Sequence, residues 1–304
     1  MLKKFNIKNN VLVDTKDNLG ELMIFSDPTP EEKKYLTNTF QLDAHTLNSA
    51  LDPEELSRLE FEPEHIALIF KRPRNFSGKD QLLFKVASMG MFLFKDRLVV
   101  VISEDIPLLT GKRFGVVQSL KDVFLKIIYN SISHYIEHLK VINMISDEIE
   151  KKISTSLENK YLLNLFSLEK SLVYYSNAIS SNGFVFEKLK NHSSRIGFDE
   201  RLLEMLEDIT VENSQCLRQT DIYSNILASL MDARASVVNN NLNMLMKTLN
   251  LIAICIMLPA LVVSFFSMNV KIPFQGYPYA FWIIVGLAVV SIAVTVGVWY
   301  RKKW

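Results

Sequence analysis

The side chains with the clearest capacity for chemistry share one face of a predicted helix near the C-terminal end of the sequence. On a helical wheel with about 100° per residue they fall within a sector of about 60°. This set, called the amide stripe below, comprises Asn239, Asn243, Met246, Asn250, Met257, Leu261, Ser264 and Met268. A ring of Asn carbonyl groups, one from each of several copies, can accept hydrogen bonds from the water shell of a cation. Such a ring suits an ion that loses its water slowly, such as Mg²⁺.

The middle of the amide stripe is apolar, and Met257 and Leu261 are predicted to form a dry constriction. The stripe leads to Ser267, Met268 and Asn269 at its outer end. A second interpretation needs no ion, because Asn and Ser side chains also hydrogen-bond between packed helices inside membranes. We take the pore-lining interpretation as the prediction and keep helix packing as its alternative.

The remaining reactive side chains do not indicate an enzyme or a nucleic-acid-binding protein. The chain has 34 basic and 33 acidic residues, so it lacks the strong positive field that nucleic acid selects. It has no Gly-rich phosphate loop and no paired metal-ligand motif. His134 and His138 have helical spacing but no acidic ligand nearby, and are predicted to lie on a polar helix face. Cys216 and Cys255 are far apart in sequence and favour neither a disulfide nor a cysteine metal site.

Two apolar segments near the C-terminus are long enough to cross a membrane. Residues 249–266 give a run of about 18, close to the lower limit for a hydrocarbon core of about 30 Å. Residues 280–300 give a run of about 21 without any charge. The second run ends in the interfacial aromatic residues Trp299 and Tyr300, followed by a basic cluster. We therefore predict two transmembrane helices.

Basic residues near the ends of these segments predict the orientation of the chain. Lys247 precedes the first segment, and Arg301, Lys302 and Lys303 follow the second. Because positive charges favour the cytoplasmic side, these four residues are expected at the inner membrane interface. An even number of spans then places both termini in the cytoplasm. The expected localisation is the cell membrane, as a multi-pass protein without an N-terminal signal peptide.

The first part of the sequence reads as a mixed α and β domain. Apolar, β-prone runs occur at residues 22–25, 66–70, 82–87, 91–94 and 98–102, and helical patterns at 30–40 and 44–51. A polar turn between residues 94 and 98 predicts a hairpin. Beyond Gly115 the apolar residues take helical spacing, with a turn predicted near Ser154, Thr155 and Ser156, so two long antiparallel helices follow.

A very long helix is predicted to lead into the first membrane segment. Residues 198–258 contain neither Gly nor Pro, which as one helix would extend about 90 Å. Apolar residues follow a broken heptad along it: Leu202, Leu206, Ile209, Cys216, Tyr223, Leu227, Leu230 and Val237, interrupted by Asn213, Thr220 and Arg234. Such a helix needs packing partners. Two spans cannot enclose an aqueous path, so we expect a homo-oligomer around an axis.

These patterns divide the chain into consecutive parts. The predicted order is a cytoplasmic α/β domain (1–115), antiparallel long helices (116–197), a stalk helix (198–248), a pore-lining transmembrane helix (249–268), an external loop (269–279), and a second transmembrane helix with a basic tail (280–304). The predicted fold class is an α+β membrane protein.

The stripe segment resembles the pore helix of CorA-type magnesium transporters. The matching residues are the Asn-rich run 239–243, Met257-Leu258-Pro259, and Ser267-Met268-Asn269, where the family's hallmark is Gly-Met-Asn. Further matches are residues 50–60, Gly276-Tyr277-Pro278 and the basic C-terminus. The resemblance implies a homopentameric funnel with an N-terminal α/β/α domain, a stalk and an inner ring of first spans. It also implies passage of Mg²⁺, with Co²⁺ or Ni²⁺ as further ions, past an outer ring of Asn269 and an inner ring of Asn243.

The sequence departs from the family pattern at three places. The hallmark glycine is Ser267, which adds a side chain at the pore mouth. The loop 270–275 carries Lys271 and no acidic residue, so it would concentrate a dication weakly. An acidic pair that helps bind regulatory Mg²⁺ in family members is Asn48-Ser49 here. Asp208, at the position of the partner, is therefore a doubtful metal ligand and is expected to be a solvated carboxylate.

Two other functions stay open at this point. A ZntB-type protein with the same fold would carry Zn²⁺, although no His or Asp on the amide stripe could coordinate it tightly. A membrane-anchored sensor or assembly protein that does not conduct would also accommodate the three departures. Ion flux distinguishes all three.

Overall fold

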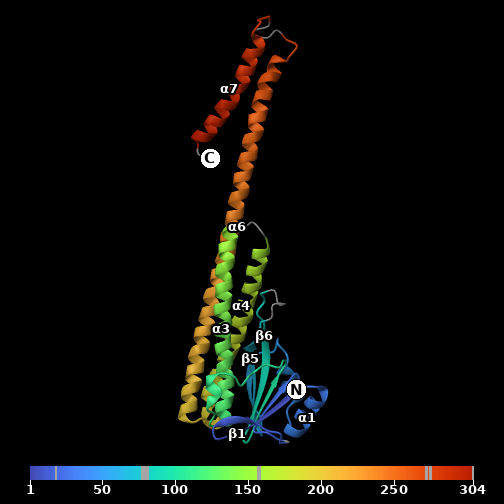
Figure 1. Ribbon diagram of the computed structural model, residues 1–304, viewed down its shortest axis with the longest axis vertical. Helices are drawn as coiled ribbons and strands as arrows, with labels where there is room; N and C mark the ends of the chain where they lie inside the picture. The colour runs from blue at the N-terminus through green and yellow to red at the C-terminus, as the bar shows by residue number, and fades with distance from the viewer. Residues whose placement is uncertain (18, 77–81, 156–158, 271–272, 274–275, 303–304) are drawn as a thin grey trace. The chain divides into compact units, whose positions relative to one another are not determined.

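The computed structural model describes residues 1–304 except 18, 77–81, 156–158, 271–272, 274–275 and 303–304 (Figure 1). It divides into two compact units, Met1–Met231 and Asp232–Trp304. The strands are β1 (Leu2–Lys8), β2 (Val11–Asp14), β3 (Leu22–Ser26), β4 (Arg58–Phe61), β5 (His65–Pro73), β6 (Val86–Phe94) and β7 (Leu98–Ile102). The helices are α1 (Pro30–Phe40), α2 (Ala44–Ser49), α3 (Leu120–Thr155), α4 (Asn159–Asn191), α5 (Ser193–Ile196), α6 (Glu200–Phe266) and α7 (Ala280–Arg301), with a 3₁₀ turn η2 (Lys112–Gly115).

The strands form one sheet in the order β2-β1-β3-β7-β6-β5-β4. Among the strand pairs formed by the described residues, β3 and β7 are parallel, with Ile24 opposite Val100, and the other neighbours are antiparallel. The predicted hairpin is confirmed, because Phe94 N–H donates to the Arg97 carbonyl between β6 and β7. Because β5 and β7 are both antiparallel to β6, they run in the same direction, and their C-terminal ends lie at the same end of the sheet.

Strand alternation gives the first unit three layers. Along β3, Leu22 and Ile24 belong to the larger core cluster, whereas Met23 and Phe25 belong to a second cluster with Leu36 of α1. The larger cluster contains the buried faces of α3, α4 and the first part of α6. The N-terminal α/β/α arrangement predicted for the chain is therefore present in this unit.

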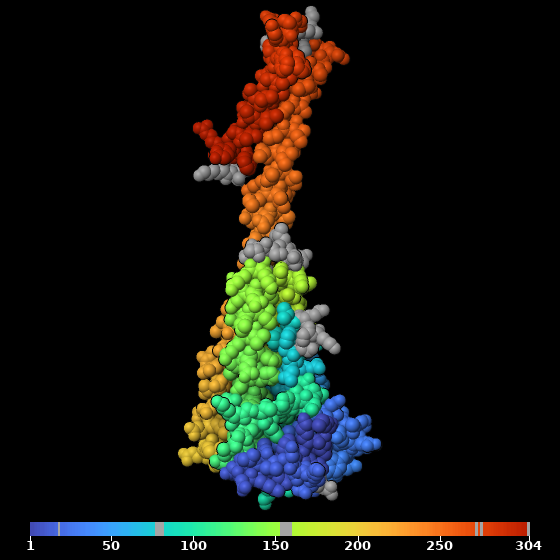
Figure 2. All heavy atoms as spheres, in the orientation of Figure 1, coloured from blue at the N-terminus to red at the C-terminus, as the bar shows by residue number. Residues whose placement is uncertain are grey.

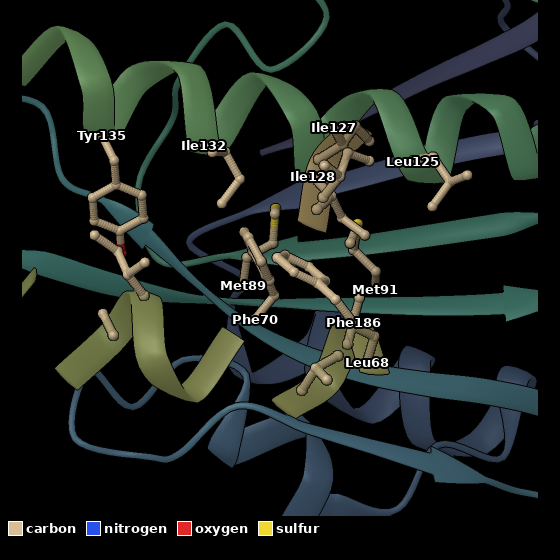
Figure 3. Packing of buried hydrophobic residues seen from close by; sticks show 14 of the residues in the cluster. Leu68, Phe70, Met89, Met91, Leu125, Ile127, Ile128, Ile132, Tyr135 and Phe186 are labelled. Atoms are coloured by element: carbon tan, nitrogen blue, oxygen red, sulfur yellow. The ribbon is translucent and has the colours of Figure 1, made fainter. Parts of the chain in front are cut away.

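Figure 3 shows the packing of α3 onto the sheet. Ile128 and Ile132 of α3 point toward Met89 of β6 and Phe70 of β5, and Phe186 of α4 lies beside them. Each of these side chains is at most 1% exposed. Full burial of each such side chain is worth about 1.5–3 kcal/mol, so this contact is the main apolar attachment of the long helices to the sheet.

The sequence predictions for strands were partly wrong. Segments 22–25, 66–70 and 98–102 correspond to β3, β5 and β7. Segments 82–87 and 91–94 were expected to be separate, but β6 is continuous through Gly90. A Cβ atom at Gly90 would lie 2.5 Å from Ala50 Cβ, so the glycine reflects close packing, not a turn. Strands β1, β2 and β4 were not predicted, because polar residues dominate their exposed faces.

The long helices follow the prediction more closely. Helix α1 begins and ends where expected and starts with a capping box, in which Thr29 and Glu32 hydrogen-bond reciprocally. Helix α3 ends at Thr155 and α4 begins at Asn159, and the rest of the predicted turn lies outside the described residues. Helix α6 starts after Asp199, whose carboxylate accepts from Leu202 N–H at 2.8 Å, and continues for 67 residues.

The heptad of α6 is covered by this same chain over its first half. Leu202, Leu206, Ile209, Cys216 and Leu227 are buried in the larger core cluster. The polar residues thought to interrupt the heptad lie on this buried face too. Asn213 Nδ2 donates to the Ile179 carbonyl at 3.1 Å, and Thr220 Oγ1 donates to the Cys216 carbonyl at 2.8 Å. The packing partners that the long helix was expected to need are therefore supplied along this stretch by the chain's own helices.

The turn between α2 and β4 is anchored by a buried lysine. Lys71 Nζ donates to the Pro53 carbonyl at 2.6 Å and to Ser88 Oγ at 2.9 Å. Ser88 in turn donates to the Asp52 carbonyl. Burial lowers the pKa of Lys71 to about 8, against the opposing effect of nearby Asp52. The resemblance over residues 50–60 thus coincides with a structural attachment of this turn to the sheet.

Candidate functional site

The second unit consists of the C-terminal part of α6 and the helix α7. Both helices are long and apolar enough to cross a membrane, and none of the residues in their apolar windows is buried by the unit. Figure 2 shows α7 against α6 within this unit, with much of the α6 surface uncovered by the chain. The site is built from this uncovered surface.

One face of α6 is turned toward α7. The half-buried positions Leu251, Cys255, Leu258, Val262 and Phe266 recur every three to four residues. The half-buried positions of α7 show the same spacing at Ile284, Ala288, Ser291 and Thr295. These two rows form the seam between the helices. Because most of their side chains are apolar, the seam stabilises the pair mainly through packing.

The amide stripe lies on a different face of α6. At about 100° per residue, its centre is rotated by about 140° from the row that faces α7. The side chains of Met246, Met257 and Leu261 are 61%, 67% and 51% exposed. Asn239, Asn243 and Ser264 are exposed as well. Within the described chain, then, nothing covers the stripe, and its side chains remain available to a lumen or to another subunit.

Asn250 differs from the other members of the stripe. It borders a cavity of about 390 Å³ between α6 and α7, together with Lys247, Thr295, Trp299 and Lys302. Sequence reasoning missed Thr295, although Ser291 and Thr295 are polar residues four apart in an otherwise apolar segment. Both hydroxyls donate to backbone carbonyls within α7.

The outer end of the stripe coincides with the end of α6. The helix stops at Phe266, and Ser267, Met268 and Asn269 follow it directly. Ser267 donates to the Ser264 carbonyl oxygen from its backbone N–H at 3.2 Å and from its hydroxyl at 2.9 Å. Ser267 is not among the residues with positive φ. The backbone at this position therefore does not require glycine, which removes the steric objection to serine here.

Pro259 lies within α6 just before the outer third of the stripe. Its ring nitrogen cannot donate to the carbonyl of Cys255, yet the helix continues to Phe266. Proline is tolerated in membrane helices where neighbouring groups satisfy the freed carbonyl. The stripe keeps its helical periodicity across Pro259, because Met257, Leu261 and Ser264 are all exposed.

The basic interface residues fall at the same end of the second unit. Lys247 and Lys302 border one cavity, and Arg301 is the last residue of α7. Lys303 lies outside the described residues. Lysine chains at such positions can extend toward lipid head groups while their stems contact apolar surface.

The candidate regulatory metal site has no ligand set within the described part of one chain. Asp208 is exposed on α6, and no group of three or more His, Cys, Asp or Glu side chains there could hold a metal ion. Ser49 Oγ accepts from Arg58 Nη2 at 3.0 Å, so this serine contributes to the turn that follows α2. The two positions that replace the acidic pair therefore show no metal-binding arrangement.

The histidine pair was predicted on a polar helix face, and this was wrong for His138. Its side chain is 8% exposed, and Nδ1 lies 2.5 Å from the Tyr175 hydroxyl. The His134 ring is 4.2 Å away between centroids. Burial, with a smaller contribution from His134, lowers the pKa of His138 to about 4. His138 is consequently neutral near pH 7 and acts as a core residue.

The chain is similar to known proteins over most of its length. The family model described as CorA-like Mg²⁺ transporter protein matches residues 23–302. The cobalt/magnesium transport protein CorA of Methanocaldococcus jannaschii is 25% identical over 293 residues, covering 91% of this chain and 89% of that protein. The complete structure of the CorA magnesium transporter from the same organism matches with a TM-score of 0.84 and 21% identity, covering 100% of this chain and 98% of that one. The cytoplasmic domain of ZntB from Vibrio parahaemolyticus matches with a TM-score of 0.62 and 13% identity, covering 78% of this chain and 98% of that one.

Proposed function

The chain belongs to the family of CorA-like Mg²⁺ transporter proteins, and from this premise we propose that it conducts Mg²⁺ through a homopentameric pore lined by the amide stripe. Members of this family are ion transporters and not enzymes, so the family relationship supports divalent-cation transport by this chain. The finer statements, which concern the ion, the number of subunits and the residues that contact the ion, form the proposal.

The observation that carries the proposal is the exposed, uncharged face of α6 turned away from α7. An ion path needs polar groups that face a lumen, and Asn239, Asn243 and Asn269 offer amide oxygens without a fixed charge. Such oxygens would bind the water shell of Mg²⁺ weakly enough for the ion to leave again. The apolar residues Met257 and Leu261 between them would form the constriction that closes when dry.

The assembly follows from the same geometry. One copy supplies a single pore helix and one outer helix, which cannot enclose a path. Copies arranged around an axis would bring the amide stripes together and leave α7 on the lipid side. Five copies are proposed because of the family relationship. Mass measurement in mild detergent would overturn this proposal if it gave a monomer or a dimer.

The proposed orientation places both termini in the cytoplasm. Lys247, Arg301 and Lys302 supply the positive charges near the inner ends of the two spans. A single cysteine introduced by Lys302→Cys should react with a membrane-impermeant thiol reagent only after the cells are opened. The native Cys216 and Cys255 must be replaced beforehand, and labelling of intact cells would contradict this topology.

The ion is tested by flux into liposomes that contain the purified protein. Uptake of Mg²⁺, Co²⁺, Ni²⁺ and Zn²⁺ is compared in parallel, with protein-free liposomes as the blank. Mg²⁺ uptake that Co²⁺ shares or inhibits supports the proposal, since the archaeal relative is a cobalt/magnesium transport protein. Uptake of Zn²⁺ alone would favour a ZntB-like transporter. Absence of any flux from a correctly assembled oligomer would favour a membrane-anchored sensor.

A further inference from the structure

A polar cavity of about 380 Å³ lies in the first unit, outside the proposed ion path. It opens where β5 and β7 end, at the edge of the sheet where their C-terminal ends meet. Among its lining residues are Arg72 of β5, Thr110 of the loop after β7, Arg113 of η2, and His134 and Glu137 of α3. The volume lies within the range of small-molecule sites.

Arg72 supplies a buried guanidinium at the base of this cavity. It is only 2% exposed, and its Nη2 donates to Glu104 Oε1 at 2.8 Å. Its Nη1 donates to the Pro73 carbonyl at 3.2 Å, whereas its Nε has no hydrogen-bond partner among the described residues. Glu104 also accepts from Arg74 Nε at 3.1 Å, so one carboxylate is shared by two guanidinium groups. Because a buried charged donor without an acceptor is costly, this arrangement favours a further anion at the site.

Arg113 is held in place on the opposite side by its neighbours. Its guanidinium lies 3.9 Å from the Tyr129 ring centroid, and Nη1 donates to Asn130 Oδ1 at 3.2 Å. Asn130 Nδ2 donates to the Thr110 carbonyl at 2.9 Å, which ties the loop to α3. The amide of Asn130 thus uses both of its ends for positioning. Arg113 retains further N–H donors in a fixed orientation, which lowers the entropy lost when an anion binds.

The other lining groups indicate which chemical groups a bound anion could contain besides its negative charge. His134 is neutral near pH 7, because burial lowers its pKa below the usual value. Glu137 is an acceptor at the exposed rim, where it would repel a bare anion but accept a hydrogen bond from a hydroxyl group. The apolar side chains Ile106 and Ile127 line another part of the wall. The cavity therefore combines a cationic end, an acceptor and apolar surface.

We propose that this cavity binds a small phosphate monoester with a hydroxyl-bearing body, such as a sugar phosphate or a mononucleotide. The Arg113 guanidinium contacts the phosphate oxygens as a planar fork, and Arg72 adds a contact through N–H groups that the Pro73 carbonyl and Glu104 do not engage. The Glu137 carboxylate accepts from a hydroxyl of the body. All lining residues of this cavity belong to the first unit, and the proposed binding does not depend on which ion the chain transports.

Binding is measured on the full-length oligomer in detergent by titration calorimetry in Mg²⁺-free buffer. The probes are ribose 5-phosphate, AMP, inorganic phosphate and unphosphorylated ribose. We expect one of the two monoesters to bind at least about tenfold more tightly than inorganic phosphate, and ribose to show no binding. Equal binding of inorganic phosphate and the monoesters, or no binding of any phosphate, would overturn the proposal.

Three variants make the test specific for these residues. Arg113→Gln should weaken monoester binding about tenfold, because it removes one charge-assisted contact from an exposed, fold-tolerant position. Lys112→Gln is the matched control, since it removes the same charge from the adjacent residue, which does not line the cavity, and should leave affinity unchanged. Glu137→Gln should reduce the preference for monoesters over inorganic phosphate about threefold, because it replaces the charged acceptor of the ligand hydroxyl and removes repulsion that acts on both phosphates. An affinity unaffected by Arg113→Gln, or an equal loss in Lys112→Gln, would contradict the assignment.

Discussion

The hydroxyl of Ser267 donates to the carbonyl oxygen of Ser264 at 2.9 Å, and the backbone N–H of Ser267 donates to the same oxygen at 3.2 Å. The serine that replaces the family's hallmark glycine thereby completes the last turn of α6 with both of its donors. A helix end leaves carbonyl groups without intrahelical partners, and here one of them receives two hydrogen bonds. Serine in place of glycine is therefore accommodated by local hydrogen bonds, and its added side chain need not conflict with the end of α6.

Ser267→Gly should keep ion uptake within about twofold of the parent, because glycine adopts the same backbone region and keeps the N–H donor. Ser267→Ala isolates the hydroxyl and should also transport, with a loss of stability of about 0.5–1.5 kcal/mol for one hydrogen bond. Liposome flux and thermal unfolding in detergent measure the two effects. Loss of flux in both variants would show that the hydroxyl itself contacts the ion path.

Asn269→Ala should abolish cation uptake while the oligomer stays intact, since the change removes hydrogen bonds to the water shell of the ion but little packing. Uptake is measured in liposomes and assembly by mass measurement in mild detergent. Parental uptake in this variant would show that the outer amide does not recognise the ion.

Asn243→Leu should likewise reduce flux, because an apolar ring dries the inner end of the path. Asn240→Leu is the matched control: its side chain is rotated by about 100° from Asn239 and points away from the stripe, so flux should change much less. If Asn269→Ala and Asn243→Leu both transported like the parent, the amide stripe would be a packing feature and the sensor alternative would gain support.

Gly90→Ala should destabilise the first unit by about 1–3 kcal/mol, because the added Cβ would lie 2.5 Å from Ala50 Cβ. The contact couples β6 to the turn after α2. The double variant Gly90→Ala/Ala50→Gly removes one of the two colliding atoms and should recover part of the loss, as measured by denaturant unfolding. Additive losses in the double variant would exclude this contact as the cause.

Asp208→Ala should leave the Mg²⁺ dependence of flux nearly unchanged. The carboxylate is exposed, and no metal-binding cluster includes it within the described residues. A lone carboxylate holds a hydrated dication weakly. Flux is recorded at a series of internal Mg²⁺ concentrations for the variant and the parent. A large shift of the curve would reveal ligands from another subunit that complete the site.

The stability of the first unit should fall as the pH drops from 6.5 to 4. The pKa of His138 is lowered from 6.5 to about 4, so in this window the unfolded chain takes up a proton that the folded chain does not. The unfolding free energy therefore decreases toward acid pH. His138→Gln keeps a polar partner for the Tyr175 hydroxyl but cannot titrate, and it should show a shallower decrease between these pH values. An unchanged slope would assign the pH dependence to other groups, of which the neighbouring His134 is the first to test.

Local sequence order predicted much of this protein. The helical period placed the amide stripe on one face of α6, and the lengths of the apolar runs predicted the two spans. Polar and aromatic residues at 299–303 indicated where the second span ends. The helical pattern at residues 30–40 predicted the bounds of α1, and the structure begins this helix with a capping box. These features depend on neighbours along the chain, so a single sequence is enough to recognise them.

Other features depend on residues that are distant in sequence, and only the tertiary structure decided them. Lys71 is buried because the Pro53 carbonyl and Ser88 come together beside it. His138 lies in the core, where its ring nitrogen contacts the hydroxyl of Tyr175 on another helix. The first half of the α6 heptad faces α3 and α4 of the same chain, whereas periodicity alone could not say which helix would cover it. In the same way, Arg72 and Arg113 line one cavity because β5 and β7 run in the same direction and end at the same edge of the sheet.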